Sequence, residues 1–596
     1  MKTSPTKARI GLAALLLAGA SVPAIGQDTP ESLLPPGFND PAPTPTPAPT
    51  APSAAVPSQP AAPAAGTEDV PVAALNLNFS DTLGNASVAA EQVDLARYEL
   101  PEFAKHSLRV VGAFASGNAA FPANGFGTAD GRYLATLMRR LDAPVASRWV
   151  SIVLRRALMS PLDTPPGANG ADFAAERAWV LLRMGEVNAA RAVIEDVDTD
   201  NYTTRLLQVA MQTALASGDP GAMCPIVEKG VATIEQRGWA LAQAMCAGLA
   251  GKPDAAGDLL RQARRGTSAS DIDNLLAEKV VGTGAQGRRA VTIEWPGVSE
   301  LTAWRWGLAT ATGVEVPDDL YATAGPQVRY WQALAPNIDP AARVASAELA
   351  ASAGVFSSAG LVDLYGEIEQ AGDAGGAATV ARDLRTAFSA SDVGDRVKAL
   401  RTLWDGADTP RGRYARLILT ARAASWIPAS KTIEAPETLI ASMLSAGYDA
   451  PAMEWRADVA PGSAGWGLVT LADPVATGGI AAGDLDSFSE AQGRRKGQLL
   501  LAGLAGLGRL SAADAQRSAA ALDVPIGAGN AWTQAIDAAG QRGDAATVAL
   551  LAATGMQSRT WNAVRPEALF HIVAAMRAAG MANYARMVAV EAITRA

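Results

Sequence analysis

The amino-acid sequence predicts an all-α protein: an α-solenoid of stacked antiparallel helical hairpins, preceded by a disordered Pro-rich segment. The first observation is a set of three turn glycines, Gly185, Gly218 and Gly251, which follow one another at intervals of 33 residues. The second is that apolar residues at helical spacing flank each glycine. A fixed period of this length is typical of stacked helical hairpins, each of which buries its apolar face against its neighbours.

The apolar stripes support a helix on each side of these turns. Residues three and four apart lie on one face of a helix, so stripes at this spacing mark its buried side. The clearest stripes are Val187, Ala190, Ile194 and Val197 in one segment, and Trp239, Ala242, Cys246 and Leu249 in another.

Length and composition agree with a large folded protein. The chain has 596 residues, of which 49% are hydrophobic and 18% are charged, and this length predicts several domains or one long solenoid. Its formal net charge is −9. An acidic chain has no overall attraction for phosphate backbones, so we expect no nucleic-acid partner.

Residues 1–26 have the features of a secretory signal peptide. Lys2, Lys7 and Arg9 precede a short apolar run, and cleavage is expected near Gly26, before Gln27. An uncleaved anchor is the alternative, although the run is shorter than the roughly 20 residues that span a bilayer. We therefore expect export, a periplasmic location and no transmembrane segment in the mature chain.

Residues 27–72 are rich in Pro, Ala and Thr, with PAPTPTPAPTAP at their centre. Such a segment has little apolar surface to bury, and its prolines favour extended backbone. We predict a disordered linker, which acts as a tether or as a ligand for a proline-binding partner.

The rest of the chain divides at two stretches that have the composition of loops, residues 267–289 and 451–479. We expect an N-terminal helical-repeat region over 73–290, a middle helical region over 291–450 and a C-terminal helical-repeat region over 451–596. A helix is also expected around 101–115. In the middle region Asp339 is placed to cap a helix that begins at Pro340. Turn glycines return near the C-terminus at Gly508, Gly543 and Gly580.

The segment MGEVNAARAVIEDVD resembles the second half of a tetratricopeptide-like repeat, with Gly185 at the turn and Ala190 as the small residue where two helices cross. GKPDAAGDLL repeats this pattern with Gly251 and Ala256. The middle unit departs from it, because Met223 stands at the small-residue position. The family's Trp, Tyr and terminal Pro positions are unmatched. The resemblance covers about 95 residues and implies an α-solenoid, without implying a particular function.

Cys224 and Cys246 are the only cysteines, and we predict that they form a disulfide. They are even in number, and the expected export places them in an oxidising compartment. Cys224 is expected on the second helix of its hairpin and Cys246 on the next helix. Because consecutive helices run antiparallel and turn near Arg237, the two side chains can face each other. The alternative is a pair of buried free thiols.

Several patterns suggest chemistry but lack its context. Gly282 to Gly287 matches G-x-G-x-x-G, yet a helical pattern precedes it where a dinucleotide site needs a strand. The two histidines, His106 and His571, are far apart in the sequence and are expected to be ordinary helical residues. The basic groups Arg155–Arg156 and Arg494–Lys496 are interpreted as solvated helix faces. We expect no cofactor and no metal site.

The architecture also resembles the superhelical arm of soluble lytic transglycosylases, which is an α-solenoid of this kind. Those enzymes imply a catalytic Glu-Ser pair and a downstream Gly-Leu-Met-Gln stretch. Here Glu-Ser occurs only at Glu31–Ser32, in the expected linker, and the second motif is absent. The resemblance therefore extends to the arm and not to the catalytic domain.

Aromatic residues gather in the middle region. Such rings either pack in helix seams or stack on a glycan or partner protein. Core packing is the favoured interpretation, and partner binding is the alternative. The residues are Trp295, Trp304, Trp306 and Trp331.

With no residue cluster that specifies a reaction, we expect a non-catalytic interaction scaffold of the bacterial cell envelope. Its partners would be envelope proteins, bound through a helical-repeat surface. The alternative is a peptidoglycan- or glycan-associated accessory protein of cell-wall enzymes. An enzyme that uses carboxylates among the 59 acidic residues is a third class.

Overall fold

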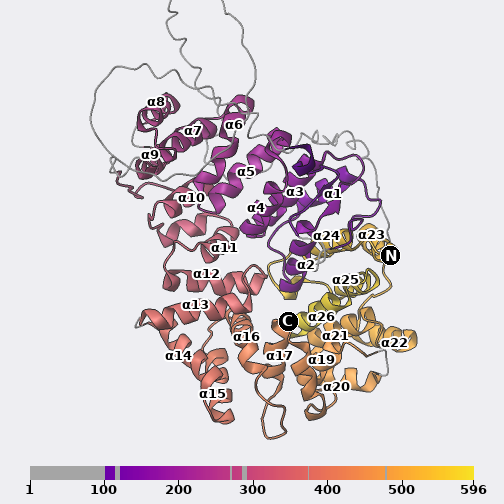
Figure 1. Ribbon diagram of the computed structural model, residues 1–596. Helices are drawn as coiled ribbons and strands as arrows, with labels where there is room; N and C mark the ends of the chain where they lie inside the picture. Colours follow the sequence, from indigo (N-terminus) through magenta and orange to yellow (C-terminus); the bar gives the residue numbers. More distant parts are fainter. Residues whose placement is uncertain (1–100, 115–120, 269–270, 285–290, 373–374, 477–479) are drawn as a thin grey trace, which may run out of the picture.

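The computed structural model describes residues 101–114, 121–268, 271–284, 291–372, 375–476 and 480–596. The expected signal peptide (1–26) and Pro-rich segment (27–72) lie outside the described residues. Within the described ranges the protein is all-α, and its helices pack against their neighbours (Figure 1). In these ranges no helix combines the length and hydropathy needed to cross a bilayer.

The first nine helices are α1 (Gly131–Arg140), α2 (Arg148–Met159), α3 (Gly170–Arg183), α4 (Val187–Glu195), α5 (Thr204–Ala216), α6 (Val227–Thr233), α7 (Arg237–Leu249), α8 (Pro253–Ala263) and α9 (Ile272–Gly284). The next nine are α10 (Ala303–Ala311), α11 (Gln327–Leu334), α12 (Pro340–Ala353), α13 (Ser358–Ala371), α14 (Gly376–Ser389), α15 (Val393–Asp405), α16 (Pro410–Ala424), α17 (Glu437–Ser445) and α18 (Asp449–Glu454). The last are α19 (Ala464–Ala472), α20 (Ala482–Gln492), α21 (Arg494–Gly506), α22 (Ala512–Leu522), α23 (Ala531–Arg542), α24 (Ala545–Gly555), α25 (Pro566–Ala578) and α26 (Ala582–Arg595).

Short elements complete the fold. The 3₁₀-helices are η2 (Glu102–Ala104), η3 (Thr199–Asn201), η4 (Pro220–Ile226), η5 (Asp318–Thr323), η6 (Trp455–Asp458) and η7 (Trp561–Ala563). The strands β1 (Val110–Val111) and β2 (Leu162–Asp163) pair antiparallel, with Val110 opposite Asp163 and Val111 opposite Leu162.

The turn chemistry read from the sequence is confirmed. All six predicted turn glycines have positive φ, between 64° and 88°. At Gly185 (φ 88°) there is also no room for a side chain, because an added Cβ would lie 2.5 Å from the Cβ of Tyr330. Asp339 accepts a hydrogen bond from the backbone of Ala341, and Pro340 is the first residue of α12. These local signals therefore end and begin helices where they were predicted to do so.

Three expectations were wrong. The helix expected around 101–115 is replaced by η2 and the short strand β1. The stretch 267–289 contains α9, whose buried residues Leu276 and Val281 pack with α7. The stretch 451–479 likewise contains most of α18 together with η6 and α19. Glycine and alanine were mistaken for loop residues, although tertiary packing stabilises both inside helices.

The first and last helices of the described chain are in contact. Helix α2 packs on α3 and α4, and it also packs on α24 and α26 (Figure 1). Helix α1 contacts α24 in the same region. The fold therefore brings residues near 150 beside residues near 590.

A buried carboxylate fixes this contact. Glu591, 1% exposed, projects from α26 to the N-terminus of α2. It accepts hydrogen bonds from the backbone amides of Arg148 (2.8 Å) and Trp149 (3.1 Å) and from the hydroxyl of Ser147 (2.6 Å). The Ser147 hydroxyl in turn accepts from the amide of Val150. Because the first amides of a helix have no partner within it and carry partial positive charge, a carboxylate stabilises this end.

Arg148 connects the same point to the middle of the chain. Its guanidinium donates to the carbonyl oxygens of Ala351, in the last turn of α12, and of Ser445, the last residue of α17. It also donates to the carbonyl oxygen of Phe356, in the connection between α12 and α13. Burial lowers the pKa of Arg148. The carbonyls at helix C-termini carry partial negative charge, so they compensate a buried cation. We call Glu591, Ser147 and Arg148, with these contacts, the central clasp.

A second ion pair, between a half-buried arginine and a buried carboxylate, lies along the same side of α2. Arg155 donates to Glu186 (2.7 Å), which precedes α4, and to the carbonyl of Gly354 (3.0 Å), which follows α12. Gly354 has φ 94°, and an added Cβ would lie 2.8 Å from the backbone oxygen of Arg148. Burial raises the pKa of Glu186 to about 7, and Arg155 opposes this shift.

Glu591→Ala should lower the free energy of unfolding by about 3 kcal/mol, because it leaves the start of α2 and the buried cations without their carboxylate. Glu591→Gln retains an acceptor oxygen and should lose less. Urea titration followed by circular dichroism measures both. Glu195→Ala, which removes an exposed ion pair, is the control and should change stability by less than about 1 kcal/mol. Equal effects of the two alanine variants would contradict the role of the clasp.

Glu186 should make stability depend on pH between about 5 and 8. Because its pKa is raised on folding to about 7, the folded state holds this proton more tightly than the unfolded state. The stabilising contribution is therefore present at pH 5 and is lost as the pH rises through 7.

Relative to Glu186→Gln, which does not titrate, the wild-type protein should lose on the order of 2 kcal/mol of stability from pH 5 to pH 8. Thermal melts at each pH measure this difference. Glu195→Gln, at an exposed position, should run parallel to wild type. If Glu186→Gln also ran parallel, the buried carboxylate would not be the titrating group.

Candidate functional site

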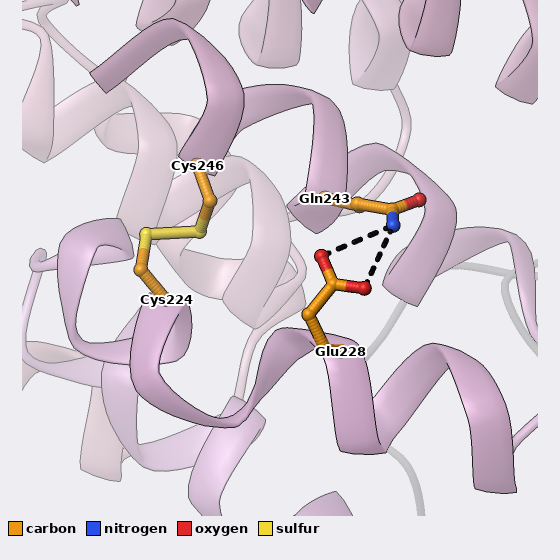
Figure 2. Close-up of a disulfide and its surroundings, with 4 residues drawn as sticks. All are labelled: Cys224, Glu228, Gln243 and Cys246. Carbon is orange, nitrogen blue, oxygen red and sulfur yellow. Dashed lines mark hydrogen bonds between the residues drawn. A yellow bond between two sulfur atoms is a disulfide. The ribbon is translucent and has the colours of Figure 1, made fainter. Parts of the chain in front are cut away.

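Cys224 and Cys246 are brought together as the sequence predicts. Their sulfur atoms lie 2.08 Å apart and their Cα atoms 5.4 Å apart, which is disulfide geometry (Figure 2). Cys246 lies on α7, whereas Cys224 lies in the 3₁₀-helix η4 rather than in an α-helix. Pro225, inside η4, has no amide hydrogen to donate, which explains why the regular helix expected there does not form. Beside the disulfide, Gln243 donates to both carboxylate oxygens of Glu228 (Figure 2).

The aromatic residues singled out in the sequence are packed inside the helices. Trp304, Trp306 and Trp331 are each at most 1% exposed, and the rings of Trp306 and Trp331 meet edge to face at 5.6 Å. Trp331 donates to the carbonyl of Leu182. Trp295 is half-buried and donates to the carbonyl of Glu315. These contacts favour core packing over partner binding for the first three residues.

The two histidines and the glycine-rich pattern form no common site among the described residues. The Nδ1–H group of His571 donates to the carboxylate of Asp537 at 2.9 Å, whereas the Nδ1–H group of His106 donates to the carbonyl oxygen of Asp196. Gly282 and Gly284 belong to the last turn of α9, so a helix and not a strand precedes this glycine pattern. Over the described ranges no group of three or more His, Cys, Asp or Glu residues has the arrangement of a metal site.

A cavity of about 930 Å³ lies where α15, α16, α21 and α26 meet the segment around η7. Two further hollows adjoin it and share lining residues with it. One, of about 790 Å³, shares Arg401 and Asp405 with the cavity, and the other, of about 210 Å³, shares Lys496 and Thr438. We call the cavity and the two hollows together the basic groove.

Basic side chains dominate the wall of the cavity. Six basic side chains line the cavity, whereas Asp405 is its acidic side chain. Ala596, the last residue of the sequence, lies in the same wall. Four arginines are exposed, and Lys496 and Arg595 are half-buried. The six are Arg401, Arg411, Arg413, Lys496, Arg559 and Arg595. This cluster stands out in a chain of net charge −9.

Most of these charges lack an acidic partner among the described residues. Arg595 pairs with Glu591 at 2.6 Å, but the other five form no ion pair with a described carboxylate. Arg401 donates to the carbonyl of Glu434, and Arg411 to that of Arg559. Carbonyl contacts leave the net positive charge in place. The groove therefore attracts anions.

Two helix N-termini add to this potential. α16 begins at Pro410 and α21 at Arg494, and neither has an acidic residue in its first turn. Instead Arg411 and Arg413 lie in or next to the first turn of α16, and Lys496 lies in that of α21. Burial lowers the pKa of Lys496. Cations are disfavoured at the positive end of a helix, so this placement costs stability.

The floor of the cavity is aromatic and joins the central clasp. Trp404, Tyr414 and Trp561 are each at most 5% exposed. Trp561 donates to Glu591, and the guanidinium of Arg595 lies 4.5 Å from the centre of the Tyr414 ring. The floor is thus held rigidly, while the arginines at the rim remain available to a ligand.

The interpretation of both basic groups as solvated helix faces holds for Arg494, which is exposed, and needs correction for the other residues. Arg155 and Arg156 are half-buried, and they bond to Glu186 and Tyr584. Arg495 donates to carbonyls around η7, and Lys496 lines the basic groove. A signal was present in the sequence: three cations in the first turn of α21, an arrangement that the helix dipole disfavours. Arg401 and Arg559, by contrast, carry no such signal.

Cys224→Ser with Cys246→Ser should lower the free energy of unfolding by roughly 3 kcal/mol, because the disulfide closes a loop with a sequence separation of 22 residues. Denaturant titration of the oxidised protein and the double variant measures this. Thiol titration of the denatured, unreduced protein should find no free thiol. Two free thiols, or equal stability of the two proteins, would contradict the bond.

The comparisons with known proteins give no relative from which a role could be transferred. No protein-family model, curated protein or solved structure matches this chain.

Proposed function

We propose that this protein is a non-catalytic interaction scaffold of the bacterial cell envelope. In this proposal the signal peptide directs it to the periplasm, and its helical hairpins form a tetratricopeptide-like, solenoid-type surface for protein partners. Stacked hairpins provide extended surfaces of the kind that peptides and proteins bind.

The observation that carries the proposal is the basic groove. It is open to solvent, it is lined by several elements, and five of its basic side chains have no ion pair with a described carboxylate. Charged groups that are placed at a cost to stability and have no acidic partner are typical of binding surfaces. Its side chains supply charge and hydrogen-bond donors, which suits recognition.

One further candidate is a glycan- or peptidoglycan-associated accessory protein of cell-wall enzymes. The exposed arginines and Asn562 of the cavity can donate hydrogen bonds to the hydroxyl and carboxylate groups of a glycan. A glycan binder should sediment with purified peptidoglycan in the absence of other proteins. An enzyme should in addition release a soluble product from it.

A photo-crosslinking amino acid in place of Asn562, an exposed residue of the groove, should capture a protein partner in intact cells. The same amino acid in place of Asp254, an exposed residue of α8, is the control, because α8 packs with α7 and α9 at a distance from α16, α21 and α26 (Figure 1). Mass spectrometry identifies the adducts. A light-dependent adduct at position 562 and not at 254 is expected. No adduct at 562, or the same adduct at both positions, would contradict binding through the groove.

A further inference from the structure

We infer that the basic groove binds an acidic peptide segment of the partner, with carboxylates on its arginines and one apolar side chain in the small hollow beside Lys496. This inference rests on the proposed function and names the chemistry of the partner. It is argued from charge, from helix placement and from the shape of the hollow.

The number of exposed arginines in the cavity favours a ligand with several carboxylates over a ligand with one. Arg401, Arg411, Arg413 and Arg559 are exposed around the same cavity, and none has an acidic partner among the described residues. A guanidinium binds a carboxylate through two parallel hydrogen bonds, so four such groups can hold several carboxylates of one ligand. The half-buried Lys496 adds a fifth charge at the inner end.

The placement of these cations is explained by a ligand and not by folding. Arg411 and Arg413 are near the start of α16, where an acidic residue would stabilise the helix. Lys496 has the same position in α21. An anion bound in the cavity would interact favourably with both helix ends as well as with the side chains. The bound state therefore relieves a repulsion that the free protein contains.

The small hollow suits a ligand that has an apolar part. It has a volume of about 210 Å³ and is lined by Leu417, Ala441, Leu468, Phe488 and Ile593, with Glu437 as its acidic residue. Lys496 lies between the hollow and the cavity. A leucine or phenylalanine side chain fits this volume and gains free energy from leaving water.

An acidic peptide supplies both the carboxylates for the arginines and the apolar side chain for the small hollow, whereas other anions supply negative charge alone. A sugar acid or an inorganic polyphosphate has no apolar side chain for the hollow. A long nucleic acid would also approach a protein of net charge −9, which repels it outside the groove. A short peptide places its carboxylates on the arginines and remains within the basic area.

The test measures fluorescence anisotropy of labelled peptides with the full-length protein. The main probe has four alternating aspartates and glutamates followed by phenylalanine. A second probe has serine in place of phenylalanine, and a third has lysines in place of the acids. We expect the first to bind, the second to bind about tenfold more weakly and the third not to bind. Binding should weaken as salt rises from about 50 to about 300 mM.

Arg411→Glu with Arg413→Glu should weaken binding of the main probe by at least about tenfold, because two attractive charges become repulsive. The melting temperature of this double variant should be equal to or above that of wild type, since acidic residues stabilise the start of α16.

Lys252→Glu with Arg261→Glu makes the same change of charge at the N-cap and near the end of α8, away from the groove, and should retain binding. Ala464→Leu fills the small hollow from a half-buried position and should abolish only the preference for phenylalanine over serine.

Several results would overturn the inference. The first is that the main probe does not bind. The second is that the two charge variants lose equal affinity for it. The third is that inorganic polyphosphate, added as a competitor, binds more tightly than the peptide. Tighter peptide binding after deletion of residues 27–72, which contain five acids and no Lys or Arg, would make that segment the occupant instead of a partner.

The photo-crosslinking experiment separates this inference from the function that it rests on. If Arg411→Glu with Arg413→Glu leaves the adduct at position 562 unchanged, the scaffold remains and the acidic-peptide assignment fails. If wild type forms no adduct, the scaffold itself fails.

Discussion

The carboxylate of Glu591, buried at the N-terminus of α2, is the interaction on which the arrangement of the other helices depends. It satisfies amides that α2 cannot satisfy itself, and it does so from the last helix of the chain. Arg148 then extends the connection to the ends of α12 and α17. One residue pair thus joins the N-terminal, middle and C-terminal parts of the fold. An ion left alone at such depth would be strongly unfavourable, so these groups depend on one another.

The clasp and the basic groove are parts of one structure. Trp561 and Arg595 contact Glu591 on one side and line the groove on the other. Their buried contacts fix the floor of the cavity, so a ligand meets side chains that are already positioned. Preorganisation of this kind reduces the entropy that binding costs. The arginines at the rim are exposed, so they contribute positive charge to the groove and do not define its shape.

The parts of the fold that were predictable are those that local chemistry determines. Gly185, Gly218 and Gly251 end helices because the chain needs positive φ there, and Asp339 begins one because its side chain caps free amides. The cysteine pairing followed from two residues on adjacent elements. By contrast, nothing near Glu591 indicates that its partner lies 443 residues earlier. The groove was missed for a similar reason: Arg401, Arg413 and Arg559 resemble ordinary surface residues until the fold gathers them.

The contact between α2 and α26 also raises the contact order of the protein, which is the mean sequence separation of its contacting residues. Its hydrogen bonds join residues more than 440 positions apart, and loop closure over such a distance must precede any gain from the contact. Helix α2 cannot reach its final environment until the last helix has been synthesised. During that interval its amides and the apolar surface that α24 and α26 later cover are exposed to water. Folding should therefore finish only after α26 has been synthesised, and a nascent chain that does not yet contain α26 is a natural substrate for holdase chaperones.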